Sequence, residues 1–112
     1  MSLPQRFKLV FFAPIPAMPA IKQAIFAAGA GRYPGPGGYT EVGFTTQGRG
    51  QFRPGASANP NIGKVGELEE LDEHRFETLC VGQDVVREAV AALKKTHPYE
   101  EPAYEVYKLE DF

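Results

Sequence analysis

The sequence predicts an α+β fold of the ferredoxin-like type, in which the elements follow the order β-α-β-β-α-β and two helices pack on one face of an antiparallel sheet. Two stretches carry apolar residues at intervals of three and four, as amphipathic helices do, and four other stretches are predicted as strands. The length of 112 residues, with 43% hydrophobic residues, is that of one ordinary domain. We therefore expect residues 1–112 to form a single domain.

The first strand is predicted over residues 7–12, where Leu9 and Phe11 alternate with Val10 and Phe12. Both of its faces are apolar, which is typical of an interior strand that is covered twice. The two predicted helices cover only one face of the sheet. We therefore expect other subunits to cover the face that carries Val10 and Phe12.

The first helix is predicted over residues 17–28, because apolar residues recur there at helical spacing. Gly29 directly follows, and a glycine commonly ends a helix. Gly31 belongs to the same cap, since a phosphate-binding glycine loop would have to precede a helix instead of following one. The second strand is predicted over residues 39–47, which alternate and are rich in aromatic and β-branched residues.

The second half of the chain contains the other three elements. A long third strand, or two short ones, is predicted over residues 67–80, with a bulge or bend near residues 69–73, where the parity of the apolar residues shifts. The second helix is predicted over residues 83–97, because its apolar stripe has helical spacing and a proline follows it. The fourth strand is predicted over residues 103–109.

Charge and cysteine content exclude several classes of protein. The formal net charge of −2 argues against a nucleic-acid partner, which would require a basic surface. The single cysteine, Cys80, allows neither an internal disulfide nor a zinc finger, and we expect it to be a small buried residue in a reducing compartment. The sequence shows neither a signal peptide nor a membrane span, so we expect a cytoplasmic protein without a membrane partner.

A region rich in glycine and proline predicts an irregular excursion over residues 47–66. Residues 32–64 contain three more basic than acidic side chains, so a small anion could bind there. The alternative is that the arginines are solvated or pair with the acidic residues that follow. The candidate ligand-binding residues of this region are Arg49, Gly50, Phe52 and Arg53.

A second candidate region is the turn that contains His97, Tyr99, Glu100 and Glu101. An imidazole, a phenol and two carboxylates could form a weak metal site, with His97 and Glu100 as ligands, or perform acid–base chemistry. A structural role is the alternative, in which the His97 imidazole points inward or along the sheet edge, within reach of a carboxylate such as Glu100, Glu101 or one from a neighbouring subunit. No nucleophile–histidine–acid motif is present, so we expect no catalytic residues and no cofactor.

Five ordered motifs cover nearly the whole chain: AAGAG at 27–31, GRGQFRPG at 48–55, NPNIG at 59–63, GELE at 66–69 and HPYEEPAYE at 97–105. Together they resemble the small domain of the NGG-interacting factor three-like (Nif-three-like) family. In that family the domain is typically an insertion in a larger protein. Its fold is similar to those of the PII signalling proteins and the CutA ion-tolerance proteins, which are trimers.

The resemblance implies a PII/CutA-like fold and a trimeric assembly, here as a stand-alone version of the domain. The family's larger lobes carry a dinuclear metal site and are linked to metal-dependent hydrolase and GTP cyclohydrolase-like activities. Two histidines cannot rebuild that site. We therefore expect a non-enzymatic ligand-binding, regulatory or oligomerisation module, a homotrimer that binds a small anion or a metal in intersubunit clefts. The alternative is a small metal-dependent hydrolase that uses His97, Glu100 and Glu101.

Overall fold

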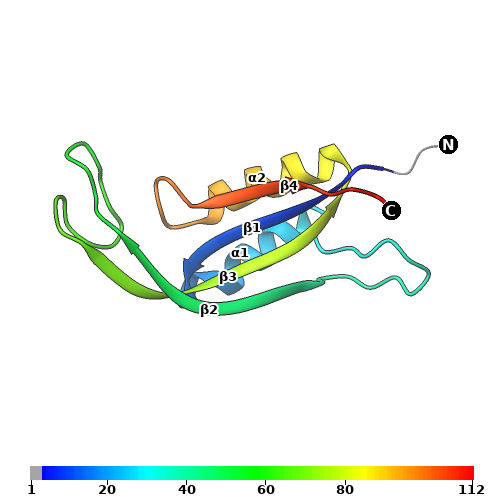
Figure 1. Ribbon diagram of the computed structural model, residues 1–112, viewed down its shortest axis with the longest axis horizontal. Coiled ribbons are helices and arrows are strands. Elements are labelled where there is room, and N and C mark those ends of the chain that lie inside the picture. Colours follow the sequence, from blue (N-terminus) through cyan, green and yellow to red (C-terminus); the bar gives the residue numbers. More distant parts are fainter. Residues whose placement is uncertain (1–3) are drawn as a thin grey trace.

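The computed structural model describes residues 4–112 and contains a four-stranded antiparallel sheet with two helices on one face (Figure 1). The elements are β1 (Arg6–Pro14), the short 3₁₀ helix η1 (Ile15–Ala17), α1 (Met18–Ala27), β2 (Gly43–Phe52), β3 (Glu69–Val81), α2 (Gln83–Thr96) and β4 (Tyr104–Lys108). The strands lie in the order β2-β3-β1-β4. The predicted fold class and element order are therefore confirmed.

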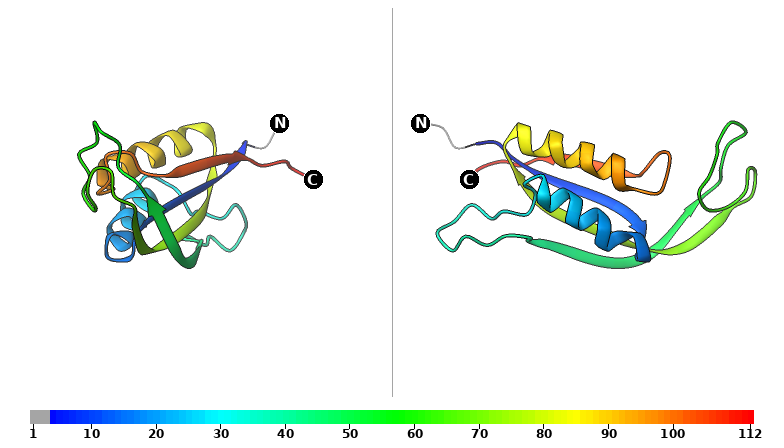
Figure 2. Two further views of the ribbon diagram at one scale, coloured as in Figure 1. Left: turned by 60° about the vertical axis from the view of Figure 1, so that its left-hand side comes forward. Right: turned by 180° about the vertical axis from the view of Figure 1, so that it is seen from behind.

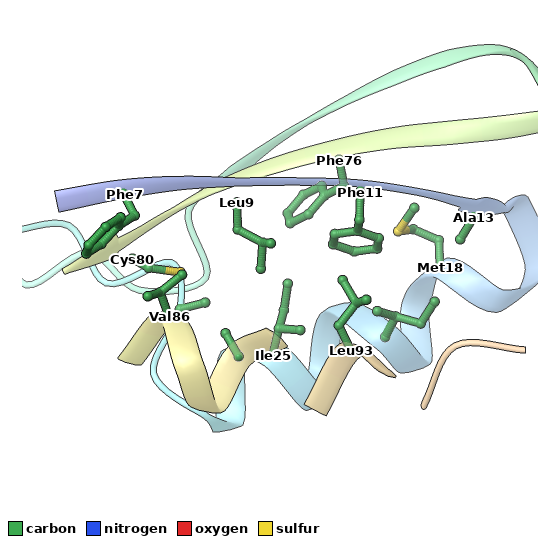
Figure 3. Packing of buried hydrophobic residues seen from close by; sticks show 13 residues of the cluster. Phe7, Leu9, Phe11, Ala13, Met18, Ile25, Phe76, Cys80, Val86 and Leu93 are labelled. Atoms are coloured by element: carbon green, nitrogen blue, oxygen red, sulfur yellow. The ribbon is translucent and has the colours of Figure 1, made fainter. Parts of the chain in front are cut away.

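The hydrophobic core lies between the inner face of the sheet and the two helices (Figure 3). Leu9 and Phe11 point from β1 toward Ile25 on α1 and Leu93 on α2, and all four side chains are fully buried. Phe11 also meets Phe76 of β3 edge to face, with ring centroids 5.8 Å apart. Burial of one such aromatic side chain contributes about 1.5–3 kcal/mol to stability.

The outer face of the sheet carries no helix, yet Val10 is only 1% exposed there. The residues paired with it in the neighbouring strands are Glu77 and Glu105, so long side chains on both sides cover it. Phe12 is half-buried. The expectation that Val10 and Phe12 require other subunits to cover them is therefore wrong for Val10, because neighbouring strands of the same chain bury it.

Helix α1 ends as the sequence predicts. Gly29 adopts a positive φ of 111° and donates its N–H to the Phe26 carbonyl at 3.0 Å, while Ala30 donates to the Ile25 carbonyl at 3.1 Å. This pair of bonds is the Schellman arrangement, which satisfies the last carbonyls of a helix.

The second strand differs from the prediction of residues 39–47 because it begins at Gly43 and continues to Phe52. Arg49, Gly50 and Phe52 therefore lie in a strand, and the irregular segment covers residues 53–68 instead of 47–66. The long partner strand explains the error, since β3 pairs with β2 without interruption from Thr78 to Glu69. A regular ladder of backbone hydrogen bonds holds β2 despite its glycines.

The third element is one long strand, and of the bulge or bend predicted near residues 69–73 the bulge is absent, because the pairing of β3 with both β1 and β2 keeps one continuous register. The shift in apolar parity has another cause. Strand β1 ends at Pro14, opposite Glu73, and residues 49–72 continue beyond it as a hairpin that projects past the helices (Figures 1 and 2). Phe76 faces the core, whereas Leu71 lies on the outer face of this projecting hairpin, which we call the arm.

No helix within residues 4–112 combines the length and the apolar character needed to cross a bilayer.

Candidate functional site: a pocket between the arm and the turn after α2

A pocket of about 300 Å³ lies between the arm and the turn that joins α2 to β4, residues 97–103. In Figures 1 and 2 the arm loop, residues 53–68, and this turn are at the same end of the molecule. We call this cavity the arm pocket. It is lined by Phe12, Gln51, Phe52, Arg53, Pro54, Gly55, Ala58, Pro60, Asn61, Ile62, Glu73, Tyr99, Glu100, Glu101 and Ala103.

Aromatic rings from three segments line the arm pocket. Phe12 comes from β1, Phe52 from the end of β2, and Tyr99 from the turn. The rings of Phe52 and Tyr99 lie 5.8 Å apart at a tilt of 56°. Flat apolar side chains in a small cavity are typical of sites that hold a planar organic group.

The position of the Glu73 carboxylate depends on Gly50 of β2, which pairs with Leu71, two residues before Glu73 on β3. A Cβ atom at Gly50 would collide with the Glu73 carboxyl group, so the absence of a side chain at Gly50 leaves room for this carboxylate. The Tyr99 hydroxyl donates a hydrogen bond to Glu73 Oε2 at 3.2 Å. Burial and the negative charge of Glu73 raise the pKa of Tyr99, so its phenol stays protonated and remains a donor.

His97 does not line the pocket but bonds to two residues that do, Phe12 and Tyr99, and it is 6% exposed, so of the two predicted orientations the inward one is found. Its partners are backbone groups and not the carboxylates that we expected: Nδ1 accepts the N–H of Tyr99 at 3.1 Å, and Nε2 lies 2.7 Å from the Phe12 carbonyl. Because Nδ1 is an acceptor, the hydrogen sits on Nε2, which donates to Phe12. Burial lowers the pKa of His97.

Both ring nitrogens of His97 are thus engaged, which leaves no lone pair for a metal ion. The carboxylate of Glu100, the other weak metal candidate, accepts the backbone N–H of Asn59 at 3.0 Å. Among residues 4–112 no group of three or more histidine, cysteine, aspartate and glutamate side chains is arranged to hold a metal ion. The geometry therefore does not support the weak metal site predicted at His97 and Glu100.

Backbone contacts fix the two sides of the pocket relative to one another. Phe12 donates its N–H to the Ala103 carbonyl at 3.2 Å, so the turn is tied to Phe12 at both of its ends. The bond between Asn59 and Glu100 joins the arm loop to the same turn. The pocket is therefore held by hydrogen bonds among β1, the turn and the arm loop.

The two candidate arginines have different environments. Arg49 pairs with Asp72 at 3.1 Å on the exposed surface, as the alternative of pairing with the acidic residues predicts. It does not line the pocket. Arg53 lines the pocket and donates to the Gly66 carbonyl at 2.7 Å. Arg53 is the only cationic residue of the lining, against the carboxylates of Glu73, Glu100 and Glu101.

The structure brings five of the eight predicted site residues to one pocket: Phe52, Arg53, Tyr99, Glu100 and Glu101. Arg49, Gly50 and His97 lie outside the lining, although Gly50 and His97 position residues within it. Sequence reasoning missed Phe12 and Glu73. The apolar second face of the first strand was a signal for Phe12, whereas Glu73 was one of several acidic residues of a strand and nothing in the sequence distinguished it.

Cys80 is fully buried in the core, as expected, and burial raises the pKa of its thiol to about 11.

Comparison with known proteins identifies the family. The GTP cyclohydrolase 1 type 2 homolog of Halalkalibacterium halodurans is 42% identical over 103 residues, which are 92% of this chain and 27% of that protein. The corresponding homolog of Bacillus subtilis is 39% identical over 92% of this chain and 26% of its own length. A crystal structure of a Bacillus cereus protein related to NIF3 superposes with a TM-score of 0.81 at 32% identity, over 99% of this chain and 27% of that one.

The chain belongs to the NIF3 family. It spans about a quarter of the length of these relatives, 26–27%. No family model matches it.

Two further solved structures share the fold at low sequence identity. Bacillus subtilis GlnK in complex with ATP has a TM-score of 0.60 at 13% identity, over 95% of this chain and 84% of that one. The periplasmic divalent cation tolerance protein CutA of Archaeoglobus fulgidus has a TM-score of 0.64 at 12% identity, over 96% and 86%. The PII/CutA-like fold predicted for this NIF3-family domain is confirmed.

Proposed function

We propose that this NIF3-family domain is a non-enzymatic module that binds a small organic molecule in the arm pocket and that functions as a homotrimer. The observation that carries the proposal is the pocket itself. It combines aromatic rings from three separate segments with charged side chains, and hydrogen bonds to Phe12 and Glu100 hold its walls in place. A preformed cavity with apolar walls and a few polar groups is the usual form of a small-molecule site.

The charges of the pocket define the class of ligand. The single cationic side chain, Arg53, donates to a backbone carbonyl, while three carboxylates face the same space. Carboxylates repel an anion and attract a cation or a hydrogen-bond donor. The small anion expected from the positive charge of residues 32–64 is therefore disfavoured here. A flat apolar group that carries an ammonium or another N–H donor fits the lining better.

A binding role is better supported than catalysis. His97 uses both of its ring nitrogens to hold backbone groups, and Tyr99 keeps its proton. Neither residue is placed to transfer a proton to a ligand. The metal-dependent hydrolase alternative requires His97, Glu100 and Glu101 to bind or activate a metal-bound group, which the contacts of His97 and Glu100 oppose. The match covers only 27% of the Halalkalibacterium halodurans relative, and we propose no GTP cyclohydrolase activity for the domain.

Trimer formation is supported by the apolar residues that remain exposed on the outer face of the sheet. Phe44 is 65% exposed and Tyr107 is 49% exposed, and their pairing partners place both on the face without helices. The resemblance to PII and CutA proteins implies three copies.

The acidic net charge and the unpaired, buried Cys80 support a cytoplasmic protein that does not bind nucleic acid.

Three compounds with the same phenyl ring test the ligand class: phenethylamine, 2-phenylethanol and phenylacetate. We expect the increase in melting temperature to be largest for the amine, intermediate for the alcohol and smallest for the acid, because ligand binding stabilises the folded state. The Phe52→Ala variant should lose the response. Arg49→Ala, on the same strand but outside the pocket, is the control and should keep it.

Two results would overturn the proposal. One is that none of these compounds, nor a wider set of aromatic amines, stabilises the protein. The other is a response to phosphates or carboxylates that disappears in the Arg49→Ala/Arg53→Ala double variant, which would return the ligand to the anionic class.

A further inference from the structure

A single imidazole holds two walls of the arm pocket from behind. His97 donates through Nε2 to the carbonyl of Phe12 on β1 and accepts through Nδ1 the N–H of Tyr99 in the turn. The rings of Phe12 and Tyr99 both line the pocket, whereas His97 does not. The His97 ring also packs against Tyr99, with ring centroids 4.9 Å apart. Both walls thus contact the same buried side chain.

Only one protonation state of His97 fits these bonds. The neutral ring with hydrogen on Nε2 supplies one donor and one acceptor, as Phe12 and Tyr99 require. A second proton would convert Nδ1 into a donor that faces the donor N–H of Tyr99. Protonation therefore removes the Nδ1 bond and places two N–H groups against each other, while the Nε2 bond to Phe12 remains possible.

The groups around His97 have opposing effects on its charge. Glu73 on β3 favours the protonated ring, and so do the bond to Phe12 on β1 and the negative C-terminal end of α2, whose last carbonyls lie next to His97. Lys94 and Lys95 in the last turn of α2 oppose it. Glu100 and Glu101, in the turn that follows α2, add negative charge at the surface. Burial is the largest effect and lowers the pKa of His97 below its usual value of 6.5.

We propose that His97 is a proton-sensitive switch that keeps the arm pocket formed at neutral pH and releases its Tyr99 wall on acidification. This inference rests on the proposed ligand site and adds regulation to it. When His97 gains a proton, the Tyr99 N–H loses its acceptor and the turn moves away from the ring. The Tyr99 hydroxyl then moves away from Glu73 and the Tyr99 ring moves away from Phe52, so the pocket opens on that side.

Nuclear magnetic resonance on the wild-type protein tests the first step. The ring of His97 and the backbone amide of Tyr99 are followed from neutral pH to about pH 5, the range in which a histidine switch acts. We expect both to titrate with one midpoint, below 6.5, and the Tyr99 amide proton to shift as its hydrogen bond is lost. A His97 titration that leaves the Tyr99 amide unchanged would overturn the proposal.

Binding of the fluorescent probe N-phenyl-1-naphthylamine, which is uncharged over this range, tests the second step. We expect its affinity to be constant well above the His97 midpoint and to fall by up to tenfold for each pH unit below it, where the open state dominates, until the weaker affinity of the open state itself is reached. The chain has one other histidine, and the matched control His74→Gln should keep this response. His97→Gln should bind the probe with an affinity that no longer changes at that midpoint.

The Glu73→Gln variant tests how much the charge of Glu73 contributes to the titration of His97. We expect its binding midpoint to move to lower pH, because the charge of Glu73 favours protonated His97. A pH response that persists unchanged in His97→Gln would overturn the switch. Absence of probe binding at every pH would count against the pocket as a ligand site, and the Tyr99 amide would still decide whether protonated His97 releases the turn.

Discussion

The Tyr99 hydroxyl donates a hydrogen bond of 3.2 Å to Glu73, and this bond connects the turn after α2 with the middle of β3. Residues 73 and 99 are far apart in the sequence, and the contact exists because Gly50 has no side chain to occupy the space of the Glu73 carboxylate. A polar pair at the edge of an aromatic pocket thus depends on a glycine in a third element. The bond is long for an O–H donor, so its contribution to stability is modest.

Replacement of Tyr99 by phenylalanine removes this hydrogen bond and keeps the ring against Phe52 and His97. We expect Tyr99→Phe to lower the free energy of unfolding by about 1 kcal/mol, because one partly buried bond to a charged group is lost. Tyr99→Ala should cost more, since the ring packing is lost as well. Urea denaturation at neutral pH measures both. Equal stability of Tyr99→Phe and wild type would show that the bond contributes nothing.

Two glycines of the same strand and face give a matched test of how Glu73 is positioned. A Cβ atom at Gly50 collides with the Glu73 carboxyl group, whereas nothing lies within 4 Å of a Cβ atom at Gly48. The end of a glutamate side chain can move, so we expect Gly50→Ala to displace Glu73 without unfolding the protein. In a double-mutant cycle, Tyr99→Phe should then cost less in the Gly50→Ala background than in Gly48→Ala. Equal costs in both backgrounds would contradict this.

The sequence was sufficient for the fold and insufficient for the pocket, for different physical reasons. Helices α1 and α2 each bury one face, so spacing alone located them to within a residue or two. Strand β2 was misplaced because its glycines were interpreted as loop residues. A glycine in a strand is unfavourable by itself, but the ladder with β3 compensates, and at Gly50 the missing side chain is needed.

The pocket depends on contacts between distant segments, which spacing does not encode. The arm and the turn were both recognised as candidate regions, but nothing in their separate motifs showed that Asn59 would bond to Glu100 or that His97 would bond to Phe12. The choice of backbone partners for His97 illustrates the limit. A carboxylate was the natural expectation for a histidine near two glutamates, but its ring is buried beside β1, where backbone groups are the available partners.

The stability of the protein should depend on His97 in a defined pH range. Well above pH 6.5 the imidazole is neutral in both the folded and the unfolded chain, so it causes no change of stability with pH. As the pH falls below 6.5, the unfolded chain binds the proton first because burial lowers the pKa of the folded state. Stability should therefore fall with a slope of up to about 1.4 kcal/mol per pH unit until the folded state also titrates.

His97→Ala isolates this contribution. At neutral pH we expect it to lower the free energy of unfolding by about 1–3 kcal/mol, because the Phe12 carbonyl and the Tyr99 N–H lose their partner. Its stability should also decrease less than that of the wild type between 6.5 and the folded-state pKa. Chemical denaturation at several pH values measures both effects. A variant as stable as the wild type that had lost a stabilising response to metal ions would instead indicate a metal site.

Cys80 should be chemically inert in the folded protein. Its side chain is fully buried and burial raises the pKa of the thiol to about 11, so the reactive thiolate is scarce at neutral pH. We expect iodoacetamide to leave the folded chain unmodified and to add one group in denaturant, as mass spectrometry would show. Rapid modification of the folded protein would mean that the strand carrying Cys80 opens far more readily than its place in the core implies.

The assembly can be tested on the exposed part of the outer face. The proposed trimer should have three times the mass of the 12.3 kDa chain by light scattering at micromolar concentration. Phe44→Asp places a charge on an exposed position of this face, so we expect folded monomers with an unchanged circular dichroism spectrum. Tyr39→Asp is the control, because Tyr39 is equally exposed but lies in the loop before β2, and it should remain trimeric.

Substitution of Val10 should act by a different mechanism. The side chain is buried within one chain, so Val10→Asp should unfold the protein instead of producing folded monomers, since an unpaired buried charge costs several kcal/mol. Phe12→Asp should be milder because Phe12 is half-buried and borders the pocket. Folded monomers from Phe44→Asp together with unfolded Val10→Asp would assign the interface to the exposed part of this face. A wild-type mass of one chain would exclude the trimer altogether.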